Sequence, residues 1–553
     1  MPDYQRTYAW DSEQLDDFWN DIREAMMTKT EHYWGTLTLR QTDRSEKCEE
    51  KDTLFKVFEV VDGQQRITTL YLFLLAISKS KPPIRDNFIK CGNTYRLELG
   101  GLNNQFLKDL VDGKDAQPTM KTNRLLKGAL RFFENQLAAY TGQSDYCDRI
   151  SDYLQRATIS LEFVVQDETL AVRAFQTLND RGKQLTLLDK TKSFLMFYSL
   201  RYLNNTMAPL INTVFGNVFM NYDLIRGIGE KEEIDYISGK GFSEDEVLRF
   251  FYHYFAYYAI TKYHLPDAYD YDISAEDVFK QFLKKSCEHL RMDSAQLKDF
   301  IEDFLKSFAK FVNAFQRIIN NTQKDCQLKK LFSFLRLNAR LYPLIISLES
   351  EGILDQTLLS IIESVDMRIY KIRGTDPRAG LYRDAISRIK LNPDKTIIDK
   401  TIRDFVNSLM WDDNFRSYLG QLLYGNPGLK YALWEFEKNQ TPSFDDCDYT
   451  FYKDLQIDHI FPEETTLAFP AHGFQDVLDY ISNNDKIGNL TLLEEKINKR
   501  VRNRPPQNKI NEYQNSNVSE TKKLSTFISN FGFDKNNIED RTKKMVDFCV
   551  KRW

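Results

Sequence analysis

The sequence contains little histidine and no segment suited to a membrane or to secretion. Only six of its 553 residues are histidine, and no uninterrupted apolar run reaches the length that spans a bilayer. The first ten residues, MPDYQRTYAW, lack the basic start and apolar centre of a secretory signal. These absences exclude a membrane-spanning protein, and we expect a soluble one.

The seven cysteines are scattered along the chain without close pairs, at positions 48, 91, 147, 287, 326, 447 and 549. This spacing argues against a zinc knuckle and against a disulfide framework. We therefore expect a reducing compartment and a cytoplasmic location.

The chain is several times longer than one hydrophobic core requires, so more than one domain is expected. Hydrophobic residues make up 42% of it, and neither an internal repeat nor a low-complexity tract is present. The pattern predicts a multidomain α+β protein with three parts: a mixed α/β domain over 1–200, a helical region over 201–440 and a small domain over 441–553.

The first part shows strand and helix signals in alternation. Residues 55–61, FKVFEVV, predict a strand, DGQQR follows as a turn, and ITTLYLFLLAISKS predicts a buried helix. A second strand is expected over 158–165. A helix carrying FQTLN is expected to follow it.

Helical periodicity dominates the middle of the chain. One apolar stripe begins after Asp293 and Ser294, and another runs from Leu358 to Ile372 and stops at Gly374. The aromatic run FFYHYFAYY at 250–258 could stack nucleic-acid bases, but aromatics at helical spacing indicate a core.

One histidine stands in an unusual setting. In LQIDHIFPEE, at 455–464, it directly follows an aspartate in a strand-like run, and IGNLTLLEEKINKR begins some thirty residues later. The segment predicts strand, loop, strand and helix. Neighbouring side chains on a strand face opposite ways, so Asp458 and His459 can share a site only if the strand ends or bulges there, and Pro462 is a plausible terminator.

Two functions fit this histidine. A lone histidine is commonly structural, hydrogen-bonded at a strand end. Alternatively, hydrolysis of a phosphodiester needs a base that titrates near neutral pH and a hard cation at the phosphate. His459 would be the base, Asp458 and Asn498 would be oxygen ligands of Mg²⁺, and Asn489 would brace the loop and the histidine.

Positive charge gathers at the same end of the chain. Residues 481–553 hold 15 Lys and Arg against 9 Asp and Glu, a net charge of +6 that leaves −11 on the rest. The run KRVRNR, which we expect to continue the helix that carries Asn498, would attract a DNA backbone, although a solvated helix face explains it as well. The DNA-contacting candidates are Lys499, Arg500, Arg502 and Arg504.

The turn DGQQR at 62–66 also has two interpretations. An Asp-Gly pair between a strand and a helix is sufficient for a simple turn. In the alternative, Gly63 lets a ligand approach the backbone, the helix that follows offers its amides to an anion, and Arg66 grips phosphate oxygens. The second interpretation predicts a phosphate cradle.

The C-terminal motifs resemble a known nuclease pattern. IDHIFP, then GNLTLL, then an asparagine nine residues after the first one, is similar to the HNH, or ββα-metal, motif. The third motif residue is Asn498 in place of histidine. The resemblance implies an HNH nuclease domain over 441–553 that uses Mg²⁺ or Mn²⁺.

Motifs at both ends of the chain together resemble GmrSD-type (type IV) restriction endonucleases. The N-terminal ones are PDYQRTYAW, HYWGTLTL, VVDGQQRITTL and FQTLNDRGKQLTLLDKTK. The resemblance implies a ParB/sulfiredoxin-like first domain that binds and hydrolyses an NTP, ATP or GTP, and a protein that cuts modified phage DNA. The implied nucleotide-site residues are Asp62, Gly63, Gln64, Gln65 and Arg66, with Gln5, Arg6, Asn179, Arg181 and Lys192 as secondary candidates.

The leading hypothesis is therefore a nucleotide-regulated, metal-dependent DNA endonuclease of phage defence. Its alternative is a nuclease-inactive, ParB-like nucleic-acid-binding regulator. A purely structural helical scaffold does not account for two polar constellations in one chain. A homo-oligomer is compatible with either function, and no membrane partner is expected.

Overall fold

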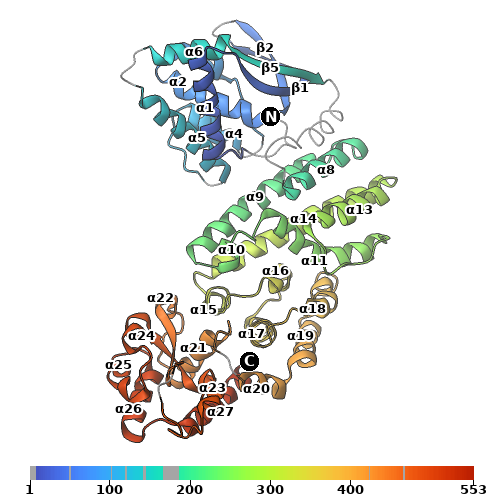
Figure 1. Cartoon of the computed structure of the whole chain (residues 1–553). Helices are drawn as coiled ribbons and strands as arrows, with labels where there is room; N and C mark the ends of the chain where they lie inside the picture. Colours follow the sequence, from blue (N-terminus) through green and yellow to red (C-terminus); the bar gives the residue numbers. More distant parts are fainter. Residues whose placement is uncertain are drawn as a thin grey trace.

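A computed structural model describes residues 8–48, 52–100, 103–118, 121–140, 145–165, 186–421, 424–464 and 467–553. The chain forms an N-terminal unit with a small sheet, a helical middle region and a C-terminal unit, which follow one another along the molecule (Figure 1). Helices predominate, and the architecture is α+β and multidomain. Within these residues, no helix is long and apolar enough to cross a membrane.

The N-terminal unit packs helices on one side of a three-stranded sheet (Figure 1). The strand order is β2-β1-β5, in which β1 runs antiparallel to β2 and parallel to β5. The strands are β1 (His32–Cys48), β2 (Thr53–Asp62), β5 (Thr158–Val165) and a small pair, β3 (Lys90–Cys91) and β4 (Thr94–Tyr95). The helices are α1 (Ser12–Thr28), α2 (Gln64–Ser78), α3 (Pro82–Ile84), α4 (Asn103–Val111), α5 (Lys121–Ala138) and α6 (Tyr146–Arg156). The strands predicted at 55–61 and 158–165 are confirmed.

The start of α2 differs from the expected turn. Gly63 stands at the N-cap position with φ of 94°, and the helix begins at Gln64. Glycine adopts this left-handed conformation without steric cost. The prediction of a turn over all of 62–66 is therefore wrong for its last three residues, and Arg66 projects from the first turn of the helix.

The middle region consists of packed helices. Its long helices are α8 (Leu187–Tyr202), α9 (Ala208–Lys231), α11 (Glu244–Tyr263), α14 (Ser294–Asn321), α16 (Tyr342–Ser350), α17 (Gln356–Val365), α19 (Lys395–Met410) and α21 (Leu429–Gln440). Shorter ones are α10 (Asp235–Ser238), α12 (Ala275–Asp277), α13 (Lys284–Leu290), α15 (Cys326–Lys329), α18 (Arg378–Asp384) and α20 (Asp412–Leu419).

The predicted helix signals in this region are confirmed. Helix α14 begins at Ser294, where the predicted stripe starts, and the Asp293 side chain caps it by accepting the amides of Ala295 and Gln296. The second stripe forms α17 and continues as a π-helix to Ile372, after which Gly374 adopts φ of 67°. The aromatic run lies in α11, where residues 250–256 are buried, so its core interpretation is confirmed.

The C-terminal unit is built around a short antiparallel pair, β6 (Leu455–His459) and β7 (Leu490–Glu494). Its helices are α22 (Tyr449–Asp454), α23 (Val477–Asn484), α24 (Glu495–Val501), α25 (Ile510–Gln514), α26 (Ser519–Phe531) and α27 (Lys535–Arg552). One large core runs through the middle region into β6 and β7, while a separate small core fills the outer part of the unit.

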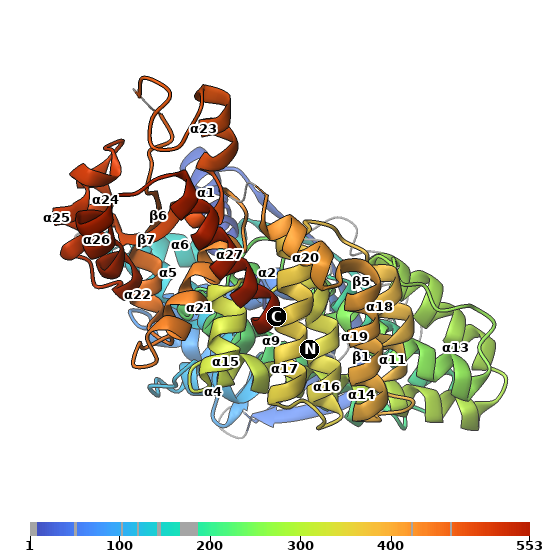
Figure 2. The same cartoon turned by 90° about the horizontal axis from the view of Figure 1, so that it is seen from below.

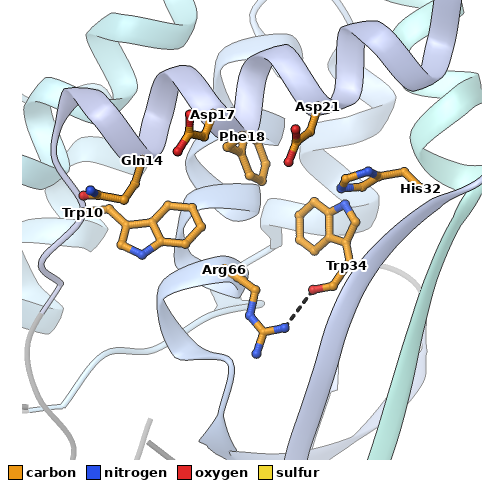
Figure 3. A pocket seen from close by; sticks show the side chains of 8 residues that line it. All are labelled: Trp10, Gln14, Asp17, Phe18, Asp21, His32, Trp34 and Arg66. Carbon is orange, nitrogen blue, oxygen red and sulfur yellow. Dashed lines mark hydrogen bonds between the residues drawn. The ribbon is translucent and has the colours of Figure 1, made fainter. Parts of the chain in front are cut away.

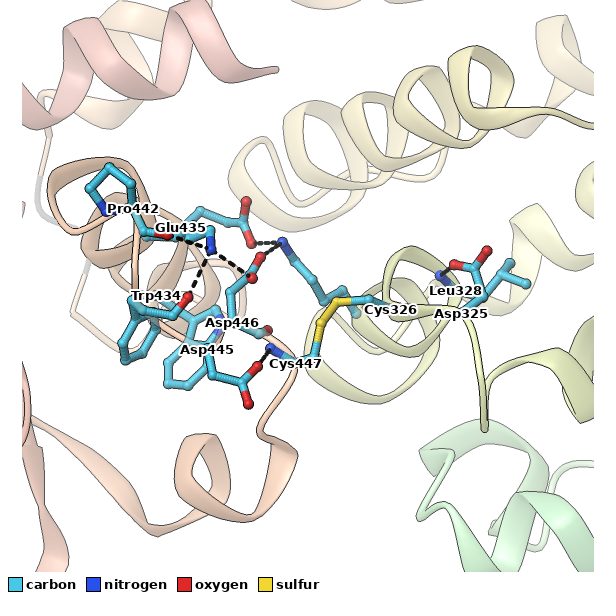
Figure 4. The surroundings of a disulfide bond; sticks show 12 residues. Asp325, Cys326, Leu328, Trp434, Glu435, Pro442, Asp445, Asp446 and Cys447 are labelled. Atoms are coloured by element: carbon cyan, nitrogen blue, oxygen red, sulfur yellow. Dashed lines mark hydrogen bonds and ion pairs between the residues drawn. A yellow bond between two sulfur atoms is a disulfide. The ribbon is translucent and has the colours of Figure 1, made fainter.

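Four cysteines form two disulfides. Cys48 is bonded to Cys91, and Cys326 to Cys447, with Cα atoms 5.9 and 5.6 Å apart. The second bond joins α15 in the middle region to the loop that precedes α22 (Figure 4). The expectation that argued against disulfides is wrong for these four residues, because segments far apart in the sequence meet in the fold.

A buried carboxylate ties the end of the chain to the middle region. Glu363 of α17 is 3% exposed and accepts hydrogen bonds from Tyr431, Arg552 and the Trp553 indole, the last at 2.8 Å. Figure 2 shows α27 reaching from the C-terminal unit to the helices of the middle region. The last two residues of the chain are therefore held in place by an interior charge.

We predict that Glu363→Ala lowers the free energy of unfolding by about 3 kcal/mol, because the Trp553 N–H and the Tyr431 hydroxyl lose their acceptor and Arg552 keeps only Glu435 as a partner. Denaturation in urea measures the loss. The control is Glu349→Ala, which breaks a more exposed pair with Arg317 and should cost less than about 1 kcal/mol. Equal losses in both variants would contradict the role given to Glu363.

Candidate functional site

The predicted histidine lies where two strands and a helix meet. In the ladder, His459 pairs with Leu490 and Asp458 with Thr491, without a register shift. Helix α24 follows β7 directly. The two predicted strands and the helix after the second are confirmed, but the segment between the strands contains helix α23 and is not only a loop.

The His459 imidazole is buried between an aspartate and a tyrosine. Its Nε2 lies 2.9 Å from Oδ1 of Asp485, and the Tyr424 ring lies 4.2 Å away between centroids. A carboxylate only accepts hydrogen bonds, so Nε2 is the donor in this contact, and in the neutral tautomer that makes it Nδ1 keeps its lone pair. The arrangement orients a histidine that can accept a proton through Nδ1.

Asn489 holds the loop that follows the histidine. Its side chain accepts from the amide of Phe461 at 2.9 Å and donates to the carbonyls of Phe461 and Asn484. Its own carbonyl accepts from the amide of Ile460 at 2.7 Å. These are the contacts that a bracing residue requires, and its part in catalysis stays a prediction.

Asp458 faces away from its neighbour. Its carboxylate oxygens each lie 3.1 Å from Nζ of Lys509, and Oδ2 also accepts from the Tyr513 hydroxyl. Lys509 reaches the carbonyl of His459 as well. Strand β6 does end at His459, yet its regular ladder sends adjacent side chains to opposite faces, so the two residues have different partners.

Burial moves both members of this ion pair toward their neutral forms. It raises the pKa of the Asp458 carboxyl and lowers the pKa of the Lys509 ammonium, and their mutual attraction opposes both shifts. The Tyr513 hydroxyl, fully buried beside the carboxylate, has its pKa raised well above the usual range. Keeping this ion pair buried costs free energy, because both charges are removed from water. Ionisable groups with shifted pKa values are typical of functional sites.

The donor chemistry here suits a hard cation. Asp458 and Asn498 offer oxygen atoms, the ligands that Mg²⁺ prefers. Asn498 is half-buried in α24, and no described residue hydrogen-bonds its side chain. The ammonium of Lys509 already forms an ion pair with the Asp458 carboxylate. A metal ion at Asp458 would have to share or replace that contact.

The basic run does not form one helix. Lys499 and Arg500 lie in the last turn of α24, whereas Arg502 has φ of 46° and Arg504 lies beyond it. The expectation that the run continues the helix of Asn498 is therefore wrong after Val501. All four side chains are exposed, and Lys499 and Arg500 are paired with Glu495 and Glu512.

The second predicted site lies at the junction of β2 and α2. Arg66 donates to the carbonyl of Trp34 at 2.8 Å (Figure 3). It also lies 3.6 Å from Asp62. A Cβ on Gly35 would lie 1.9 Å from Arg66, so any other residue at that position would displace the guanidinium from its place. Gln65 is buried and accepts the amide of Ala9 at 2.8 Å.

The remaining nucleotide-site candidates fall in different parts of the chain. Gln64 begins α2 beside Arg66, and Lys192 lies within α8. Gln5, Arg6, Asn179 and Arg181 lie outside the described residues, as does the helix expected to carry FQTLN.

The sequence did not predict the hydrogen-bond partners of His459 and Asp458. Asp485 follows α23 and lies 26 residues after His459, while Lys509 and Tyr513 lie about fifty residues after Asp458. One signal was available in the sequence: Lys509 and Tyr513 are four residues apart, so on a helix their side chains lie on the same side.

Comparison with protein families gives a match at both ends of the chain. Residues 1–196 match the GmrSD restriction endonuclease, N-terminal domain, and residues 399–548 match the GmrSD restriction endonucleases, C-terminal domain. The chain belongs to the GmrSD restriction endonuclease family. Among curated proteins, no sequence matches it.

Membership assigns the chain to the restriction endonucleases of phage defence, whose substrate is DNA. The GmrSD C-terminal match begins at 399, inside the segment predicted as helical, and contains both strands of the histidine site. The GmrSD N-terminal match contains the junction of β2 and α2.

We predict that Asp485→Ala lowers DNA cleavage by about tenfold to a hundredfold, because the imidazole loses the partner that fixes its orientation. Asp485→Asn keeps an oxygen that can accept from Nε2 and should recover part of the rate. Cleavage rates of the two variants, each checked for an unchanged melting temperature, measure the effect. Identical rates in Asp485→Ala and the wild type would contradict it.

Proposed function

We propose that the protein is a metal-dependent DNA endonuclease in which His459 is the general base. The observation that carries this proposal is the contact between Nε2 of His459 and Asp485, which leaves Nδ1 to accept a proton. In this proposal the β6, β7 and α24 segment is an HNH, or ββα-metal, site. The alternative, a nuclease-inactive regulator, gives no reason for an oriented histidine beside a braced loop.

His459 would act by taking a proton from the attacking water. The imidazolium that forms would keep its hydrogen bond to the Asp485 carboxylate, which stabilises the positive charge. The Tyr424 ring covers one side of the imidazole, which limits the directions from which water can approach. Asn489 would keep the residues after His459 from moving as the DNA backbone enters.

Asp458 and Asn498 would hold Mg²⁺ or Mn²⁺, which requires Lys509 to give up the carboxylate and the Asp458 side chain to turn toward the face of β6 that carries His459. When bound, the ion would neutralise the scissile phosphate and the leaving oxygen. The exposed basic residues from Lys499 to Arg504 lie next in the chain after Asn498, so they would contact the DNA backbone. Modified phage DNA is the proposed substrate.

The N-terminal unit would bind an NTP at the junction of β2 and α2 and regulate cutting. Support comes from the left-handed Gly63, the start of the helix and the guanidinium of Arg66 in one place. This unit would have the ParB/sulfiredoxin-like fold. Nucleotide hydrolysis there is part of the same proposal.

We predict that His459→Ala lowers DNA cleavage by about 10² to 10⁴, because a positioned base contributes a rate factor of that order. Nicking of modified phage DNA in the presence of Mg²⁺ and NTP measures the rate. His472→Ala is the control, since His472 is an exposed histidine of the same unit.

The same assay tests the metal, because chelation should abolish cutting and added Mg²⁺ should restore it. Wild-type cutting by a stable His459→Ala protein would end the assignment of the base. A melting temperature that falls without selective loss of cutting would make the histidine structural.

We also predict that replacing Arg500, Arg502 and Arg504 by Gln weakens binding to all DNA sequences alike. The slope of log affinity against log salt should fall by up to about one for each phosphate that the protein no longer neutralises. Binding titrations at several salt concentrations measure it, with Lys522→Gln on α26 as the control. An unchanged slope would leave the run as a solvated surface.

A further inference from the structure

A cavity of about 210 Å³ opens in the middle region beside α10, where the ion pair of Glu233 with Lys453 joins this region to α22 (Figure 1). Its walls include residues of two π-helices, Lys330–Phe334 and Asp366–Ile372. Such turns are frequent at functional sites. The side chains that give the cavity its chemistry are Asp235, Arg336, Asn338, Tyr342 and Lys371.

Three hydrogen-bond donors of the wall lack an acceptor within the described part of the chain. The Tyr342 hydroxyl forms no hydrogen bond there, although Tyr342 is only 1% exposed. Asn338 accepts the amide of Arg340 at 3.0 Å through its side-chain oxygen, and its side-chain nitrogen donates to no described residue. The Arg336 guanidinium has neither a hydrogen bond nor an ion pair with a described residue. Buried donors are nearly always paired, so Tyr342 in particular indicates a ligand that brings acceptor atoms.

The backbone of Arg336 is held at the edge of the cavity. Its φ of 57° lies in the left-handed region, which arginine rarely adopts. Its carbonyl accepts a hydrogen bond from Nζ of Lys371 at 2.8 Å, and the amide of Leu337 donates to the carbonyl of Leu331 at 3.0 Å. Residues kept in such conformations cluster at binding and active sites. The fold therefore fixes the place from which the guanidinium extends.

A second cation, Lys430, lies close to Arg336, and no described carboxylate forms an ion pair with it. It belongs to the first turn of α21, and its ammonium lies 4.6 Å from the centre of the Tyr452 ring. Burial and the charge of Arg336 lower the pKa of Lys430 to about 8, and the charge of Asp454 opposes this shift without cancelling it. Like charges held together repel each other. A negatively charged group beside them would offset this repulsion.

The charges around the cavity favour a ligand with one negative charge. The cations are Arg336, Lys371 and Lys430. Two carboxylates oppose them: Asp235, exposed at the rim, and Asp366, fully buried 3.6 Å from Lys371. Burial raises the pKa of Asp366 to about 7, so at neutral pH its negative charge is only partial. Three cations and two carboxylates therefore leave at least one positive charge unmatched.

A phosphodiester group meets these requirements. It carries one negative charge and offers oxygen acceptors, whereas a phosphate monoester carries about −1.5 to −2 and would be repelled more strongly by Asp235. A cation or an apolar molecule would leave the donors without acceptors. The volume is below the roughly 300–1,000 Å³ of pockets that enclose a drug-sized ligand, so one group of a longer chain fits better than a whole nucleotide.

The loop between α20 and α21 links this cavity to the histidine site. The Asn426 side chain donates to the carbonyl of Lys371 at 3.0 Å, and Tyr424, two residues earlier, lies against the His459 ring. Two residues span at most about 7 Å. Phosphates follow one another about every 3.4 Å along each strand of a DNA duplex. A single duplex is therefore long enough to contact both places.

We propose that this cavity binds a phosphodiester group of the DNA backbone, with Arg336 and Lys430 as its ion-pair partners and the Tyr342 hydroxyl as a hydrogen-bond donor. The middle region would then hold the DNA at a phosphate some distance from the bond that His459 would cleave. This contact deepens the endonuclease function proposed above and rests on it for its place along the DNA.

Fluorescence anisotropy of a labelled duplex tests the contact, with the whole chain and with a chelator present so that no cutting occurs. Arg336→Gln and Lys430→Gln should each weaken binding by about threefold to thirtyfold and lower the slope of log affinity against log salt by up to about one. Lys298→Gln is the matched control, an exposed lysine of α14 outside the cavity, and should change neither quantity.

Tyr342→Phe removes only the hydroxyl. It should weaken DNA binding by about twofold to tenfold and leave the salt slope unchanged, because no charge is lost. Its melting temperature should not fall, since the hydroxyl has no hydrogen bond to lose within the described structure. A lower melting temperature with unchanged DNA affinity would make the hydroxyl structural and contradict its part in the site.

A methylphosphonate, in which a methyl group replaces one charged backbone oxygen, locates the contacted phosphate. It is moved one position at a time along the duplex. At one position away from the cleaved bond it should weaken binding by the wild type but not by Arg336→Gln, because both changes remove the same contact. The absence of any such position, or wild-type affinity in a stable protein that carries both Arg336→Gln and Lys430→Gln, would overturn the assignment.

The nuclease and the cavity can fail separately. A wild type that binds DNA with Mg²⁺ and NTP present but never cuts it would remove the endonuclease function, and the affinities of the variants would still decide the cavity. A wild type that cuts DNA, with cavity variants that bind it as tightly, would remove the cavity alone.

Discussion

The buried carboxylate of Glu363 fixes α27, and α27 in turn fixes the histidine site. At its far end the helix is held through Arg552 and Trp553. Nearer its start, Arg541 donates to the carbonyls of Gly488 and Leu490, and Thr542 accepts the amide of Gly488 at 3.2 Å. A Cβ on Gly488 would lie 2.1 Å from a backbone oxygen of the helix, so the contact is as close as the backbone allows. The strand that pairs with His459 therefore rests on a helix anchored in the middle region.

The two faces of β6 have different partners. On one face, His459 contacts Asp485 and the Tyr424 ring. On the other, Asp458 forms a buried ion pair with Lys509. Charges removed from water are stable only when each is matched by a partner, so Asp458 and Lys509 depend on each other. An added cation and the ammonium would compete for the same oxygens, which couples any metal binding at Asp458 to the position of Lys509.

Local signals in the sequence were sufficient for several elements and for the place of His459 at a strand end, but not for the partners of that histidine. The ladder of β6 and β7 follows from two short apolar runs, and the start of α14 from the apolar stripe that begins after Asp293 and Ser294. Asp485 could not be predicted, because its contact with His459 depends on how the intervening loop folds back. The first turn of α2 was misassigned because Gly63 resembles a turn residue, while the helix beyond it tolerates polar side chains in its first turn. Long-range pairing also hid the disulfides.

The bond between Cys326 and Cys447 makes a covalent ring of everything between them. The ring contains α17, with Glu363, and α21, which packs against the C-terminal unit. A single proteolytic cut inside it would open the ring without dividing the molecule, so the two fragments would run as one species until the disulfide is reduced. The middle region and the C-terminal unit are thus connected twice, once by the polypeptide chain and once by the disulfide.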